Sequence, residues 1–160
     1  MLKTFLKFTL IVVVSQLVTY YIAGIIAQLA LGANAFYPPS PNAISYLKDP
    51  HDPALQLLIL PAQALRGLLF AFVLFPFRQR ILEMGNWYGG FTITLVIFIM
   101  GFVAASGGMI EHFVYFKAAD YPVKFAEITF VEILIQTLLM GPIIVWLDKR
   151  FSRKIALCPV

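Results

Sequence analysis

Charged residues are scarce in this chain, and cysteine is almost absent. Aspartate, glutamate, lysine and arginine make up 12% of the 160 residues, whereas soluble domains contain about 25%. This number of charges is too small to cover the surface of a water-soluble domain. The composition therefore excludes the class of soluble globular proteins. The single cysteine, Cys158, excludes an intramolecular disulfide and the paired cysteines of redox and structural zinc motifs.

Hydrophobic residues are correspondingly abundant, at 61% of the chain, and they occur in four long runs. Because about 20 apolar residues in a helix cross the hydrocarbon core of a bilayer, the runs predict a polytopic integral membrane protein. The predicted fold is all-α, a four-helix transmembrane bundle that forms one membrane domain over residues 1–160. The predicted spans are residues 8–32, 54–77, 87–106 and 125–147.

Polar or proline-rich segments separate the runs. They predict an outer loop at 33–53, a cytoplasmic turn at 78–86, a second outer loop at 107–124 and a basic cytoplasmic tail at 148–160. Pro61 leaves two alternatives for the second span, because a helix either kinks at a proline or begins there. The second alternative would bring Arg66 closer to the outer surface.

The distribution of lysine and arginine predicts the orientation. Three segments on one side hold eight of the twelve: Lys3, Lys7, Arg78, Arg80, Lys149, Arg150, Arg153 and Lys154. The two loops on the other side hold three, Lys48, Lys117 and Lys124. By the positive-inside rule both termini are cytoplasmic, and the expected location is the bacterial cytoplasmic (inner) membrane. The first span also resembles a signal peptide, with Ala33-Asn34-Ala35 as a cleavage pattern, but its length favours a retained span.

Several polar residues fall inside the apolar runs. A charged side chain in a span costs about 2.5–3.5 kcal/mol on insertion scales, so it needs a partner or a wet cavity. The spacing places Gln63 with Arg66 on one helix face, and Glu132 with Gln136 on another. We expect Arg66 to pair with Glu132. The rest of the polar cluster is expected to be Gln63, Gln136 and Gln16, and Glu127 or Glu111 is the alternative partner for Arg66.

Two interpretations of this cluster remain open at the level of sequence. A buried pair can fix the register of helices that lipid alone would not order. An intramembrane Arg–Glu pair can also line a pathway for a transported ion or proton.

The outer loops hold weaker candidates. Glu111 and His112 are adjacent and suit general acid–base chemistry on a lipid headgroup. No metal-ligand spacing such as HExxH occurs, and no phosphate loop or dinucleotide fingerprint is found, so no metal or cofactor is predicted.

The function expected from these patterns is that of a non-catalytic accessory or assembly subunit. Its expected partners are the lipid bilayer and a second copy or a larger membrane complex, without nucleic acid. The alternatives are an oligomeric transporter or channel component that uses Arg66 and Glu132, and a membrane-embedded enzyme that uses Glu111 and His112.

Overall fold

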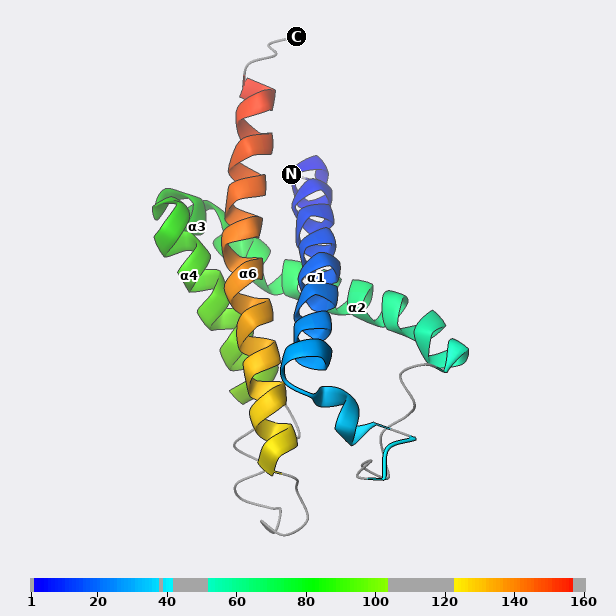
Figure 1. The fold of residues 1–160 in the computed structure, drawn as a ribbon. Coiled ribbons are helices and arrows are strands. Elements are labelled where there is room, and N and C mark those ends of the chain that lie inside the picture. The colour runs from blue at the N-terminus through cyan, green and yellow to red at the C-terminus, as the bar shows by residue number, and fades with distance from the viewer. Residues whose placement is uncertain (1, 38, 42–51, 104–122, 157–160) are drawn as a thin grey trace.

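The computed structural model describes residues 2–37, 39–41, 52–103 and 123–156, and in these ranges every regular element is helical (Figure 1). The elements in chain order are α1 (Leu2–Ala30), η1 (Ala33–Phe36), α2 (Pro53–Leu74), η2 (Phe75–Phe77), α3 (Arg78–Glu83), α4 (Gly85–Phe98), the π-helical turn η3 (Ile99–Val103) and α6 (Val123–Ala156). The predicted all-α class is therefore confirmed.

Three helical segments are long and apolar enough to cross a membrane: Leu2–Ala30, Leu57–Glu83 and Glu127–Ser152. They support the prediction of an integral membrane protein with transmembrane helices. Within the described residues α4 is too short to count as a fourth span on its own, since it has 14 residues before η3 begins. The predicted span over residues 87–106, and with it the four-helix bundle, is thus not confirmed.

Several predicted boundaries need correction. The segment 78–86, predicted as a turn, is helical from Arg78 to Glu83 as α3, because Ile81 on this short helix is buried against its neighbours. Gly85, with a φ of +86°, then reverses the chain at a value that glycine adopts without strain. The last helix continues to Ala156 instead of ending near Leu147. Of the two alternatives for Pro61, the structure has this proline inside α2, which begins at Pro53.

The helices lie in the order α4, α6, α1, α2, since the main contacts join α4 with α6, α6 with α1 and α1 with α2. Figure 1 shows α1 and α6 side by side, while α2 crosses α1 and its first half projects away from the other helices. The beginning of α1, the short α3 and the end of α6 lie at one end of the molecule (Figure 1). We call this end the basic end.

Helices approach closely where glycine occurs. A Cβ on Gly67 of α2 would lie 2.9 Å from the Cα of Val13 in α1. A Cβ on Gly141 of α6 would collide with the carbonyl oxygen of Gly90 and with Thr94, both in α4. At this second crossing Thr94 donates a hydrogen bond of 2.8 Å from Oγ1 to the carbonyl oxygen of Thr137. In lipid, such close packing and buried hydrogen bonds take the place of the hydrophobic effect in holding helices together.

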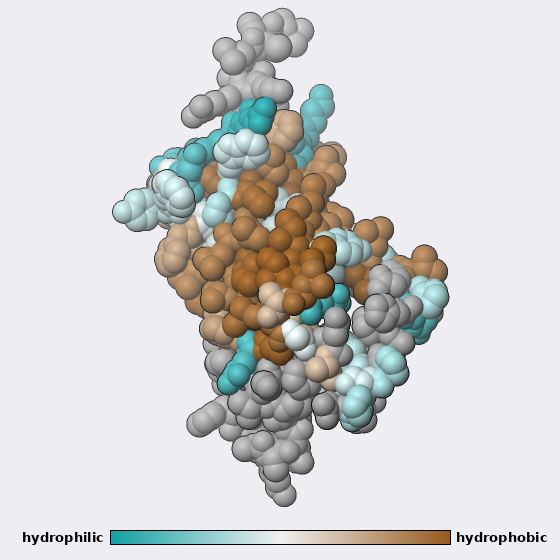
Figure 2. Space-filling view, in the orientation of Figure 1, coloured by the Kyte–Doolittle hydropathy of each residue, from teal (hydrophilic) through white to brown (hydrophobic). Residues whose placement is uncertain are grey.

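Much of the outer surface is apolar. Figure 2 shows a broad hydrophobic region over the middle of the molecule, with hydrophilic residues toward its ends. Each of the three long helices has exposed large apolar side chains, for example Leu10 (65%) of α1, Leu69 (56%) of α2 and Leu138 (49%) of α6. Exposed apolar surface on this scale is costly in water and normal where lipid surrounds the protein.

Candidate functional site

The structure brings together two of the polar residues that the sequence singles out, Gln16 and Gln63. Nε2 of Gln16 donates a hydrogen bond of 2.8 Å to Oε1 of Gln63, which joins α1 to α2 beside the close approach at Gly67. Gln16 is 1% exposed, so its amide has little access to other partners. This bond therefore fixes the place where α2 crosses α1.

Arg66 lies one turn further along α2, half-buried in the second apolar span. Its guanidinium lies 5.9 Å from the centre of the Phe70 ring. A methyl group placed on Gly101 would lie 3.7 Å from Nη2 of Arg66, so the guanidinium is next to the π-helical turn η3. Among the described residues the ion pairs are Arg78–Asp148 and Arg80–Glu83, and neither includes Arg66.

Glu132 occupies a neighbouring position on α6. A methyl group on Gly24 of α1 would lie 3.9 Å from Oε1 of Glu132. Tyr20 of α1 is within electrostatic range of both Glu132 and Arg66. The two charges are thus in one region of the protein, while the predicted direct pairing between them stays a prediction. Gln136 is buried one turn further along α6, and Glu127, the first residue of the last apolar span, is exposed.

Tyr37, which follows η1 outside the first span, lies at the edge of this region. Burial raises the pKa of its hydroxyl, and the carboxylate of Glu132 and the neighbouring Tyr20 raise it further. Tyr20, Tyr37, Arg66 and Glu132 form what we call the intramembrane polar region.

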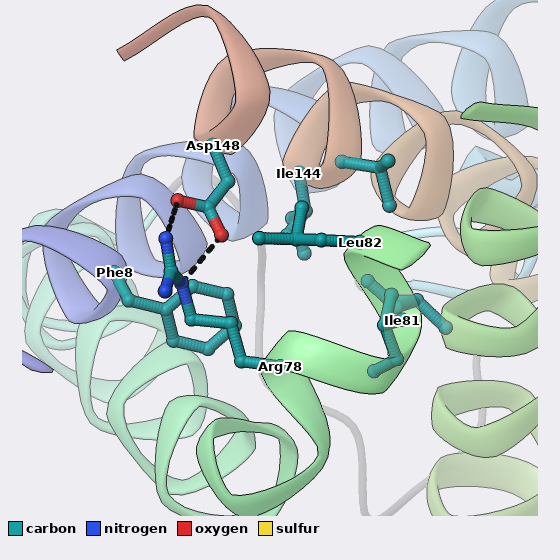
Figure 3. Close-up of a pocket in the computed structure, with 8 residues that line it drawn as sticks. Phe8, Arg78, Ile81, Leu82, Ile144 and Asp148 are labelled. Carbon is teal, nitrogen blue, oxygen red and sulfur yellow. Dashed lines mark hydrogen bonds and ion pairs between the residues drawn. The ribbon is translucent and has the colours of Figure 1, made fainter. Parts of the chain in front are cut away.

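The strongest polar contact in the described part of the chain is one that the sequence did not suggest. Nε and Nη2 of Arg78 donate to the two carboxylate oxygens of Asp148 at 2.6 and 2.7 Å, and Nη2 also donates to Oγ of Ser152 at 3.0 Å (Figure 3). Asp148 is 2% exposed and the Arg78 side chain 19%. This two-point geometry is the strongest form of ion pair between an arginine and a carboxylate.

The Arg78–Asp148 pair joins three segments at the basic end. Arg78 begins α3, Asp148 belongs to α6, and the guanidinium lies 5.9 Å from the ring centre of Phe8 in α1. Ile81, Leu82 and Ile144 close off the pair on the other side (Figure 3). Both partners are little exposed and lie among apolar side chains, which indicates a structural role.

The sequence gives only a weak signal for this pair, because Asp148 begins a run of basic residues and Arg78 lies in the segment 78–86 that is predicted as a turn. The partners are 70 residues apart, and their meeting depends on how α3 is placed against α6. A lone acidic residue at the start of a basic tail, opposite an arginine at the same end, was the one available clue.

The structure does not test the remaining candidates. Glu111 and His112 lie outside the described residues. No group of three or more metal-ligating side chains occurs in the described ranges. Comparison with known proteins gives no match, since no protein-family model, no curated protein and no solved structure is similar to this chain.

Proposed function

We propose that this protein is a non-catalytic accessory or assembly subunit of the bacterial cytoplasmic membrane. In this proposal it has four spans, one of them over residues 87–106, and both termini are cytoplasmic. The excess of lysine and arginine at the basic end supports this orientation.

The orientation predicts how Cys158, the only cysteine, reacts in membranes. A membrane-impermeant maleimide should label Cys158 in inverted vesicles and leave it unlabelled in intact cells. The matched control is Ala35→Cys in a Cys158→Ser background, because Ala35 is exposed at the opposite end of α1. This control should be labelled in intact cells, and the opposite pattern for both residues would refute the orientation.

The observation that carries the proposed function is the environment of Arg66. Its guanidinium lies in an apolar span beside an aromatic ring and η3, without a carboxylate within ion-pair distance in the described part of the chain. A charge at such a position costs about 2.5–3.5 kcal/mol. An acidic side chain on a helix of another membrane protein would lower that cost.

The placement of α2 supports the same proposal. In the most apolar part of the span Leu57–Glu83, which includes most of α2, 17% of the residues are buried inside the protein. The corresponding shares are 39% for the span Leu2–Ala30 and 33% for Glu127–Ser152. Leu57 and Leu58, in the half of α2 that projects from the other helices, are 78% and 59% exposed (Figure 1). A partner helix has room to pack along this half and to reach Arg66. The proposed partner is therefore a different membrane protein with an acidic residue in a span.

Site-specific photocrosslinking in native membranes tests this proposal. A photoreactive residue at Leu58 should give one discrete protein adduct, whereas the same residue at Leu10, an exposed position of α1, should not. The adduct should disappear with Arg66→Ala and persist with Arg66→Lys, because lysine keeps the charge. An adduct that is insensitive to Arg66→Ala, or one of twice the mass of this chain, would overturn the proposal.

A second candidate function is favoured by one observation. Arg66 of α2 and Glu132 of α6 come from different helices, and both lie in the neighbourhood of Tyr20 of α1. Such a convergence is typical of transport pathways. Proton or ion flux into vesicles, lost with both Arg66→Ala and Glu132→Gln, would favour a transporter or channel component.

A further inference from the structure

Basic side chains of three segments gather at the basic end. Figure 2 shows hydrophilic residues there, above the apolar middle of the molecule. The basic residues of this end whose side chains the structure describes are Lys3 and Lys7 of α1, Arg78 and Arg80 of α3, and Lys149 and Arg150 of α6. The described residues of this end include two carboxylates, Glu83 and Asp148.

Both carboxylates already have partners. Asp148 binds Arg78, and Glu83 lies 3.4 Å from Nη1 of Arg80. Four cations thus remain without a carboxylate in the described part of this end: Lys3, Lys7, Lys149 and Arg150.

The structure gathers several of these cations along α6. Nζ of Lys7 donates 2.8 Å to the carbonyl oxygen of Phe151 and lies 5.3 Å from the centre of its ring. This contact holds the first turns of α1 against the end of α6. Arg150 lies 5.1 Å from the ring centre of Trp146. Lys7 of α1 is therefore held next to the part of α6 that carries Lys149 and Arg150.

Aromatic side chains mark the depth of this end in a bilayer. The chain has two tryptophans, Trp87 and Trp146, which are 85% and 49% exposed, and Tyr88 is 76% exposed. All three lie toward the basic end, at the start of α4 and in the last turns of α6 before the basic residues. Because tryptophan and tyrosine favour the headgroup region, the unpaired cations lie at the level of lipid phosphates.

We propose that the basic end binds anionic phospholipids in preference to zwitterionic ones. Lys3, Lys7, Lys149 and Arg150 contact the phosphodiesters, while the flanking tryptophans pack beside the upper acyl chains. Each basic residue close to an anionic membrane surface is expected to contribute about a fivefold preference. This inference is independent of the proposed partner at Arg66.

Quenching of tryptophan fluorescence by brominated lipids tests the inference. Both tryptophans lie toward the basic end, so the signal reports the lipid in that region. The purified full chain is reconstituted in vesicles that mix phosphatidylglycerol with phosphatidylcholine, with one or the other brominated. The measured quantity is the quenching by each brominated lipid at the same mole fraction. At about 0.01 M salt, where screening is weak, brominated phosphatidylglycerol should quench at least fivefold more strongly than brominated phosphatidylcholine. The preference should shrink at about 1 M salt.

The Lys149→Gln/Arg150→Gln variant should reduce the preference at least fivefold. The matched control, Lys48→Gln/Lys117→Gln, removes two charges elsewhere in the chain and should leave it unchanged. Circular dichroism verifies folding, and Lys3→Gln, at an exposed position, replaces the double variant if that one fails to fold. Equal quenching by the two brominated lipids, or a preference that survives in the folded variant, would overturn the inference.

Discussion

Replacing Asp148 by alanine is expected to lower the free energy of unfolding by up to about 3–5 kcal/mol, because it leaves the mostly buried Arg78 guanidinium without its carboxylate. Asp148 is 2% exposed and accepts two hydrogen bonds from Arg78. The same loss would separate α3 from α6 at the basic end. The measurement is equilibrium unfolding in mixed micelles of a mild detergent and dodecyl sulfate.

Two further variants separate this effect from a general loss of charge. Glu83→Ala removes the partner of Arg80 in an exposed pair, with side chains 53% and 84% exposed, and should cost less than about 1 kcal/mol. The double variant Arg78→Met/Asp148→Leu replaces both charges by apolar groups and should recover most of the stability. An Asp148→Ala protein as stable as the Glu83→Ala protein would show that the buried pair does not hold the segments together.

Gly141→Ala is expected to destabilise the protein by about 1–3 kcal/mol, the usual cost of overpacking a well-packed interior. The added methyl group would collide with the carbonyl oxygen of Gly90 and with Thr94, so α4 and α6 would have to move apart. The movement would also strain the hydrogen bond from Thr94 to Thr137. In an uncrowded helix the same substitution stabilises the protein by about 1 kcal/mol. A loss of stability therefore indicates that α4 and α6 are in close contact at Gly141.

Gly24→Ala is the matched control for this prediction. Gly24 lies in α1, and the atom nearest to a methyl group there is Oε1 of Glu132 at 3.9 Å, an ordinary contact distance. Gly24→Ala should therefore leave the free energy of unfolding unchanged or raise it slightly. The account of the α4–α6 crossing would be refuted if Gly141→Ala were as stable as Gly24→Ala.

The sequence predicted the class of the protein and its helical runs, since both follow from composition and from the length of each apolar segment. It missed the helical character of Arg78–Glu83 because the charged residues and the glycine suggested a turn. What makes this segment a helix is the burial of Ile81 against neighbours that are distant in the sequence.

The polar contacts were predictable in part. Gln16 and Gln63 could be named because uncharged polar residues inside apolar runs need partners in lipid. The Arg78–Asp148 pair could not, because it depends on the placement of α3 against α6. The pairing of Arg66 with Glu132 required knowledge of how the two helices face each other, which spacing within each helix does not provide.

In the proposed function Arg66 pairs with an acidic residue of another membrane protein and not with Glu132 of this chain. A double-mutant cycle on the purified protein, with Arg66→Ala, Glu132→Gln and the double variant, tests it most directly. We expect the changes in the free energy of unfolding caused by Arg66→Ala and Glu132→Gln to add in the double variant, with a coupling below about 0.5 kcal/mol. A coupling of about 1.5 kcal/mol or more would show that Glu132 already satisfies Arg66 within the protein, and would contradict the claim.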